Sequence, residues 1–381
     1  MEQVEKKVSG GRLMSLDLLR GLDMFLLAVV GPVFEGLCST WKLAHGGEPL
    51  PEALTRQFTH DWSGFTLWDI IMPLFIFMCG AAIPFALPKR LVNGRAGKSY
   101  WSHVLGRVAL LWGLGLLIQG NLLDFDLKTF SFFSNTLQAI AVGYFATACV
   151  LLIPSKRIQI AIPVVLTAFY GLLMHFGGDY SNGGNVTIPL EKWMFTTFLP
   201  ADNCFVQELV NGTCLYTWFV PSIMFVVMTL CGFHATGILR NREWTPWRKA
   251  AVLGIYGGAM LAVGWILAIW VPLIKPIYTV SFTLQAMGYS ALALDALYVI
   301  TDIWMLRRGT GVLLLFGQCA LTAYLLSHPP CGAAVEALAQ SFMHGAPNLF
   351  GESLSPLLTS VCAGVLLTLA LYVRRAMKAS K

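Results

Sequence analysis

Long apolar runs recur along this chain, and they limit the folds that it can adopt. A membrane-spanning helix needs about 20 mainly apolar residues. Ten stretches meet this condition: residues 15–37, 64–87, 101–121, 132–153, 158–176, 216–238, 250–272, 278–300, 311–328 and 354–373. The composition agrees, because 56% of the residues are hydrophobic and only 12% are charged, whereas a soluble domain carries about a quarter charged residues. The sequence therefore predicts an all-α polytopic membrane protein, with residues 1–381 forming a single integral membrane domain.

The basic residues between these runs predict the orientation of the chain. Of the 26 lysines and arginines, all but five lie on or near one side of the predicted helices; the five are Lys42, Arg56, Lys128, Lys192 and Lys275. Cytoplasmic loops carry the excess of basic residues, so both termini are predicted to be cytoplasmic. The loop of residues 38–63 and the longest loop, about 177–215, are then external. Because the basic residues follow the loops instead of forming a patch, we expect no nucleic-acid partner.

The first apolar run opens with ionisable residues, which are costly inside a membrane and are therefore functional candidates. Asp17 and Arg20 are three residues apart and share a helix face with Asp23. Two interpretations remain open. Arg20 and Asp17 form an ion pair that anchors the helix at the interface, or Arg20 binds a phosphate group at the cytoplasmic mouth, for which a guanidinium is well suited.

The stretch "FTHDWSGFTLWDIIMPLF" places His60 and Asp61 directly before the second apolar run. Asp69 lies within that run and needs a partner, for which His60 and Lys275 are both candidates. An imidazole exchanges protons near neutral pH, since its unperturbed pKa is about 6.5. The predicted orientation places His60 on the external side, where it is a candidate catalytic base.

Several common site motifs are absent from the sequence. There is no P-loop, no GxSxG elbow, no Rossmann fingerprint and no Cys/His set with zinc spacing, so nicotinamide chemistry and a metal are not expected. Cys204 and Cys214 lie in the long external loop, where a disulfide is permitted; a disulfide and two free thiols are the alternatives.

The chain resembles the heparan-α-glucosaminide N-acetyltransferase family, including its bacterial homologues. The resemblance is carried by "SLDLLRGLDMF" and "HDWSGFTLWDIIMPLFIFMCGAAIPF", and it continues through "LQAIAVGYF", "KPIYTVSFTL" and "FGQCALTAYLLSH". The matching positions are Ser15, Asp17, Arg20, Gly21, His60, Gly64, Thr66, Asp69 and Pro73. The family tryptophan lies three residues after the histidine, whereas Trp62 lies two after His60.

This resemblance implies an integral membrane acetyltransferase with cytosolic acetyl-CoA as the co-substrate. The acceptor is the amine of a terminal glucosamine on the periplasmic or lumenal side, and His60 is the active-site residue. The resemblance also implies candidate acceptor-binding residues, namely Trp62, Glu35, Lys275 and Gln138. A bacterial inner membrane is the expected location, or a lysosomal-type membrane in a eukaryote.

Two mechanisms and two other functions remain open at this stage. His60 acts as a general base toward the amine, or it carries the acetyl group as an acyl-imidazole, with Asp61 or Asp69 orienting its ring. Arg20, with Arg107 or Arg240, is predicted to bind the phosphates of coenzyme A. The alternative functions are an amino-sugar permease and an O-acetyltransferase of cell-envelope glycans. A homodimer is also a candidate assembly.

Overall fold

The computed structural model describes residues 13–213 and 216–379, and in these ranges the protein is an all-α polytopic membrane protein without β-strands. Eight described helices are long and apolar enough to cross a membrane: Met14–Ala44, Leu67–Arg90, Lys98–Ile118, Lys156–Gly177, Ser222–Leu239, Pro246–Leu267, Val280–Ile303 and Glu352–Lys378. Each corresponds to one of the ten predicted spans. Cys214, and with it the candidate disulfide, lies outside the described residues, as do Lys6, Lys7, Arg12 and Lys381, which entered the prediction of orientation.

The described chain divides into two compact units. The larger unit contains Asp61–Phe65 and Met72–Val299. The smaller unit contains Leu13–His60, Thr66–Ile71 and the described residues from Ile300 onward. The two units are described separately below.

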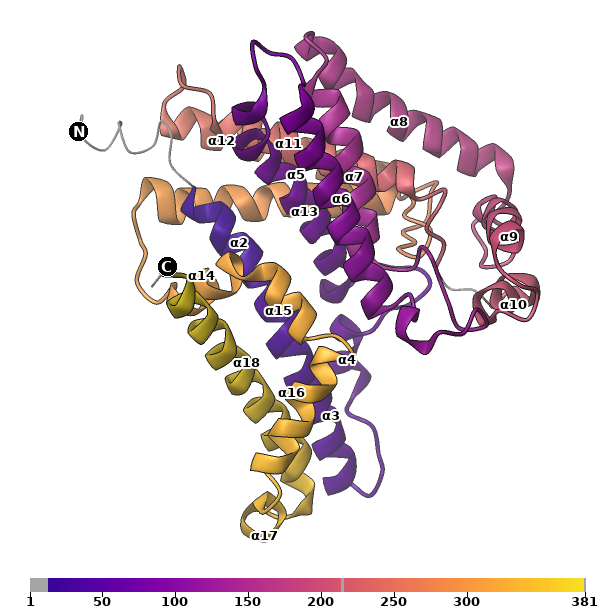
Figure 1. Cartoon of the computed structure of the whole chain (residues 1–381), viewed down its shortest axis with the longest axis vertical. Helices are drawn as coiled ribbons and strands as arrows, with labels where there is room; N and C mark the ends of the chain where they lie inside the picture. Colours follow the sequence, from indigo (N-terminus) through magenta and orange to yellow (C-terminus); the bar gives the residue numbers. More distant parts are fainter. Residues whose placement is uncertain (1–12, 214–215, 380–381) are drawn as a thin grey trace. The chain divides into compact units, whose positions relative to one another are not determined.

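The smaller unit is built around the first helix (Figure 1). Helix α2 (Met14–Phe25), a π-helical turn (Leu26–Val30) and α3 (Gly31–Ala44) form one continuous span, which extends beyond the predicted end at residue 37. Helix α14 (Gly311–Gln318) packs on α2, and α18 (Ser355–Ala379) packs on α3. The contact of α2 with α14 requires glycine, because a Cβ at Gly21 would lie 1.8 Å from the carbonyl oxygen of Leu313.

The predicted span 311–328 is wrong as a single helix. The structure has α14, then a break at Cys319, where φ is −114° and ψ is 23°, and then α15 (Ala320–Leu326). Two further helices, α16 (Cys331–Phe342) and α17 (Ala346–Phe350), precede α18. The break carries no proline or glycine, so the apolar pattern alone did not reveal it.

In the larger unit, the helices α5 (Ile71–Ala86, from Met72 onward), α6 (Lys98–Ile118), α7 (Thr136–Leu151) and α11 (Ser222–Leu239) form the centre, and α8 (Lys156–Gly177) packs on α11. Close packing again depends on glycine, because a Cβ at Gly80 would lie 1.8 Å from the carbonyl oxygen of Thr229. Helices α12 (Pro246–Leu267) and α13 (Val280–Tyr298) form an extensively packed pair.

Helix α7 is shorter than the predicted span 132–153. Asn135 fixes the start of α7, because its side-chain oxygen accepts hydrogen bonds from the backbone N–H groups of Leu137 and Gln138 in the first turn of the helix. An asparagine in this position is a strong helix N-cap. The 16 residues of α7 at about 1.5 Å each are shorter than the roughly 30 Å hydrocarbon core.

The long loop predicted to be external contains two helices, α9 (Thr187–Phe198) and α10 (Cys204–Asn211). Asn203 holds α10 against the loop between α6 and α7, since its side-chain amide donates to the carbonyl oxygens of Leu127 and Phe130 at 2.7 and 2.8 Å. A salt bridge of 3.0 Å between Lys128 and Asp202 joins the same two segments. The loop is therefore a folded part of the larger unit.

Candidate active site

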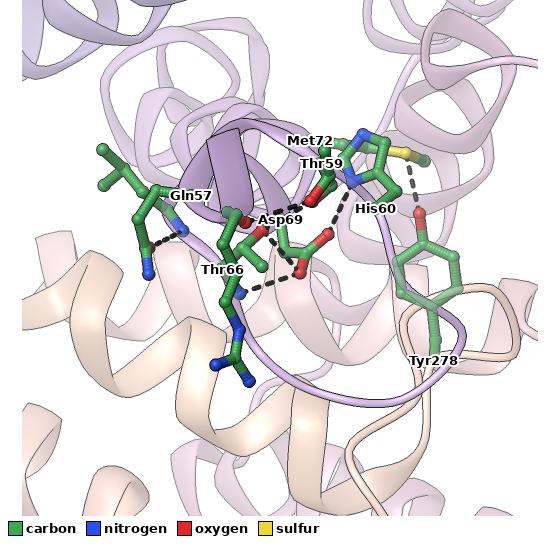
Figure 2. A network of polar contacts seen from close by, with 9 residues as sticks. Gln57, Thr59, His60, Thr66, Asp69, Met72 and Tyr278 are labelled. Atoms are coloured by element: carbon green, nitrogen blue, oxygen red, sulfur yellow. Dashed lines mark hydrogen bonds and ion pairs between the residues drawn. The ribbon is translucent and has the colours of Figure 1, made fainter. Parts of the chain in front are cut away.

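His60 and Asp69 form a hydrogen-bonded pair in the smaller unit. The ring nitrogen Nδ1 of His60 lies 2.7 Å from Oδ1 of Asp69 (Figure 2). The carboxylate is buried, with 3% of its side chain exposed, whereas 38% of the His60 side chain is exposed. Because a carboxylate accepts hydrogen bonds, Nδ1 carries the hydrogen and donates it, which leaves Nε2 as the basic nitrogen.

The second oxygen of Asp69 is held by the start of the second membrane span. Oδ2 accepts hydrogen bonds from the backbone N–H and the hydroxyl of Thr66, both at 2.9 Å. The two residues form a capping box at the 3₁₀ turn Leu67–Ile70 that leads into α5. The Thr66 hydroxyl also contacts the carbonyl oxygen of Thr59 at 3.1 Å (Figure 2). Asp69 thus has a fixed orientation before it meets the imidazole.

The segment before His60 is anchored by aromatic packing. Phe58 stacks on Phe34 of α3 with a centroid distance of 3.8 Å, and its centroid lies 5.4 Å from that of Trp68. Gly31 makes room for Trp68, because a Cβ there would lie 2.5 Å from the indole ring. The side-chain oxygen of Gln57 accepts the backbone N–H of Leu67 at 3.0 Å (Figure 2). These contacts bring His60 back to Asp69 across nine residues of sequence.

The residues that follow His60 belong to the larger unit and are anchored there. The Trp62 indole N–H donates to the carbonyl oxygen of Tyr180 at 3.2 Å, and the Gly64 N–H donates to that of Leu273 at 2.8 Å. Gly64 has a φ of +132°, which side chains rarely tolerate. Asp61 is exposed. Of the two acids considered for orienting His60, Asp69 makes the contact.

The three predicted phosphate ligands have different surroundings. Arg20 lies 3.7 Å from Asp17, and Arg240 donates to the carbonyl oxygen of Pro84 and lies over the ring of Phe85. The guanidinium of Arg107 lies 4.9 Å from the centre of the Tyr144 ring, and within the described ranges it has no hydrogen-bond acceptor. Arg107 is therefore the predicted ligand whose N–H groups are most available to a phosphate.

The other three predicted acceptor-binding residues differ in burial and in hydrogen bonding. Glu35 is exposed on α3. Lys275 is buried in the segment between α12 and α13. Gln138 is fully buried in α7, where it accepts the N–H of Ser134 at 2.8 Å and donates to the carbonyl oxygen of Phe132 at 2.7 Å. Its hydrogen bonds stabilise the start of α7.

Glu191 on α9 was not identified from the sequence. It is fully buried, and it accepts hydrogen bonds from the N–H groups of Trp218 and Phe219, at 2.6 Å for Trp218. Burial raises the pKa of this carboxyl to about 7, and its backbone hydrogen bonds oppose that rise. The groups that bond to Glu191 are backbone N–H groups 27 and 28 residues away, so no motif of side chains in the sequence indicates these hydrogen bonds. Asp23 shares its predicted helix face with Asp17 and Arg20. In the structure it is fully buried, with no hydrogen-bond partner among the described residues for either carboxylate oxygen.

Comparisons with known proteins give limited guidance. Residues 12–118 match a family described as a domain of unknown function (DUF5009). This segment contains the first helix, His60, Asp69 and α6, but it covers less than a third of the chain. A comparison with curated proteins found no match.

Proposed function

We propose that the protein is a transmembrane acetyltransferase that moves an acetyl group from cytosolic acetyl-CoA to an amine of an amino sugar on the other side of the membrane. The observation that carries this proposal is the contact of 2.7 Å between His60 and a buried Asp69 whose other oxygen is held by Thr66. An exposed imidazole fixed by a buried, hydrogen-bonded carboxylate is the arrangement expected of a general base. The resemblance of the sequence to glucosaminide N-acetyltransferases supplies the substrate class.

The proposed reaction uses Nε2 of His60. The sugar amine attacks the thioester carbonyl carbon, a C–N bond forms, and the C–S bond to coenzyme A breaks. Nε2 accepts the proton that the amine loses, and the resulting imidazolium returns it to the coenzyme A thiolate. Asp69 stabilises the imidazolium through Nδ1–H, as in other His–carboxylate pairs. In the alternative route Nε2 attacks the thioester first and the amine then attacks the acyl-imidazole.

Arg107 is proposed to bind the phosphate groups of acetyl-CoA, since its guanidinium N–H groups are the least occupied of the three candidates. Guanidinium binds phosphate through paired N–H groups. Its place on α6 agrees with the side that the basic residues predict to be cytoplasmic.

The test is acetyl transfer in proteoliposomes. Labelled acetyl-CoA is supplied to wild type and His60→Ala protein, and label is measured on glucosamine, on glucosamine oligosaccharides and on neutral glycans. We expect transfer to the amine by wild type and none by His60→Ala. Label on hydroxyl groups alone would make the protein an O-acetyltransferase. If wild type transfers no label to any acceptor, the acetyltransferase proposal is wrong.

One observation favours a second candidate, an amino-sugar permease. Asp23 is a fully buried carboxyl group in the first span without a hydrogen-bond partner, and such groups occur in the proton relays of transporters. Uptake of labelled glucosamine into proteoliposomes under a proton gradient tests this function. Uptake by wild type that is lost in Asp23→Asn, without acetyl transfer, would establish the permease.

A further inference from the structure

Large apolar side chains are exposed in the loop that joins α6 to α7. Phe125 is 90% exposed, and Leu122, Leu123 and Leu127 are exposed beside it in the sequence. Phe125 also has a φ of +52°, in the left-handed region that bulky residues rarely adopt. A strained conformation at an exposed aromatic residue points to a function for its ring.

Hydrogen bonds hold this loop in place, so the exposure of Phe125 belongs to the folded structure. The hydroxyl of Thr129 donates to Oδ2 of Asp124 at 3.0 Å, and Oδ1 of Asp126 accepts the N–H of Lys128 at 2.9 Å. Both acids that flank Phe125 therefore bond to groups of the loop itself. The salt bridge from Lys128 and the hydrogen bonds from Asn203 fix the same loop against the start of α10.

Helix α9 adds exposed aromatic rings next to this loop. Trp193 and Phe198 are 65% and 72% exposed. Phe132, which follows the loop, stacks on Phe195 of α9 with a centroid distance of 4.4 Å and lies edge-on to Phe198 at 6.0 Å. The loop and α9 are therefore neighbours. Their exposed apolar residues are called the apolar rim below: Leu122, Leu123, Phe125, Leu127, Trp193 and Phe198.

The lengths of α6 and α8 place the apolar rim at the edge of the hydrocarbon core. The 21 residues of α6 and the 22 of α8 measure roughly 32 and 33 Å at 1.5 Å each, close to the core thickness of about 30 Å. Both helices are membrane spans with mostly exposed side chains. Leu122 lies just beyond the end of α6 at Ile118, and Phe176 is exposed at the end of α8 that leads to α9. The apolar rim thus continues the lipid-facing surface of these spans into the headgroup region.

Two lysines accompany the apolar rim. Lys128 follows Leu127, Lys192 precedes Trp193, and both lysines are exposed. They are two of only five basic residues on the side predicted to be external. At the edge of a bilayer, lysine side chains extend toward the charged headgroups while aromatic rings lie at headgroup level. The charges next to the apolar rim therefore suit a lipid surface.

We propose that the apolar rim lies among the lipid headgroups of the external leaflet and anchors α9 and the loop between α6 and α7 to the bilayer. Aromatic, leucine and lysine side chains are the residues that interfacial anchors use. Burial of the Phe125 ring in lipid then offsets the strain of its backbone. The anchor is independent of the proposed acetyl transfer, because it includes none of the residues assigned to that reaction.

Photo-crosslinking of the full-length protein in liposomes of palmitoyl-oleoyl phosphatidylcholine tests the anchor. The photoreactive residue p-benzoylphenylalanine, which forms a covalent bond with a nearby C–H group on illumination, replaces Phe125 or Trp193. The control position is Glu208, which is exposed on α10 but charged. Intact-mass measurement distinguishes an adduct with lipid from an adduct with a second protein chain. Thermal unfolding confirms that each variant is folded.

We expect several-fold more lipid adduct at Phe125 and at Trp193 than at Glu208. The Tm should not change, because an exposed aromatic ring is replaced by another. Phe198 is the substitute position if either variant does not fold. The anchor is overturned if either rim position gives no more lipid adduct than Glu208. It is also overturned if the main adduct joins two protein chains, since the apolar rim would then be an interface between copies.

Discussion

The substitution Asp69→Asn tests whether the His60–Asp69 pair does chemistry. An asparagine keeps one oxygen and replaces the other with an amide NH₂. The backbone N–H of Thr66 is a fixed donor at 2.9 Å, so the remaining oxygen should stay on that side and the NH₂ should face His60. Nδ1 must then accept a hydrogen bond, which moves the ring hydrogen to Nε2 and removes the proposed base.

The expected loss of turnover is about 10³- to 10⁴-fold, as the equivalent change produces in a serine protease triad. This corresponds to about 4–5.5 kcal/mol of transition-state stabilisation. The stability cost should be far smaller, on the order of 1 kcal/mol, because the helix-capping contact to Thr66 is retained and one hydrogen bond is lost. The expected loss of turnover exceeds the loss of stability because the changed tautomer of His60 removes the base at Nε2 but leaves most of the contacts of Asp69 in place.

The assay is acetyl transfer from labelled acetyl-CoA at saturating substrate, with Tm measured on the same preparations. Asp61→Asn is the matched control, since Asp61 is the neighbouring acid, is exposed and should lose less than about 3-fold in turnover. If Asp69→Asn keeps more than a tenth of the wild-type turnover, or if Asp61→Asn loses as much as Asp69→Asn, the argument is refuted.

Three further predictions follow from other parts of the structure. Burial raises the pKa of Glu191 from 4.5 to about 7. The contribution of Glu191 to the free energy of unfolding should therefore be present below about pH 4.5, and about 3 kcal/mol of it should be lost as the pH rises through 7. A Tm that falls with pH as steeply in Glu191→Ala as in wild type would contradict this. Gly80→Ala should destabilise the protein by at least about 1–3 kcal/mol, because the new Cβ would meet a carbonyl oxygen at 1.8 Å. The control Gly258→Ala, at a position with open space around it, should be neutral or slightly stabilising. Equal Tm values for the two variants would disprove the packing argument. Arg107→Ala should raise KM for acetyl-CoA about 10-fold and lower Tm only slightly, through loss of its contact with the Tyr144 ring. Arg240→Ala should lower Tm through loss of its bond to a backbone carbonyl. An unchanged KM in Arg107→Ala would show that Arg107 does not bind acetyl-CoA.

The membrane spans were largely predictable from the sequence, because apolar composition is a property of each segment. Where the prediction failed, local backbone chemistry decided the outcome. Asn135 caps α7 and shortens it, and the chain breaks at Cys319 without a proline or glycine. The first helix continues to Ala44 through polar residues because α18 packs beside it, a tertiary contact that apolar composition does not contain.

The candidate site was predictable only in part. His60 and Asp69 were both chosen as candidates, but a separation of nine residues fits no helical face, and the sequence left Lys275 as an alternative partner. The pairing depends on Phe58 stacking on Phe34 and on Trp68 lying against Gly31. Such contacts join segments distant in sequence, so a single sequence does not reveal them.

The length of the first helix sets a condition on the membrane around it. Its 31 residues, Met14–Ala44, measure about 46 Å at 1.5 Å each, whereas the hydrocarbon core is about 30 Å thick. With the core beginning at Met14, about 21 residues cross it, and the exposed Glu35 lies at its far end. A thicker bilayer would draw this carboxylate into lipid or force the helix upright, and both are costly. We therefore expect the protein to favour bilayers of ordinary or smaller thickness over thicker ones.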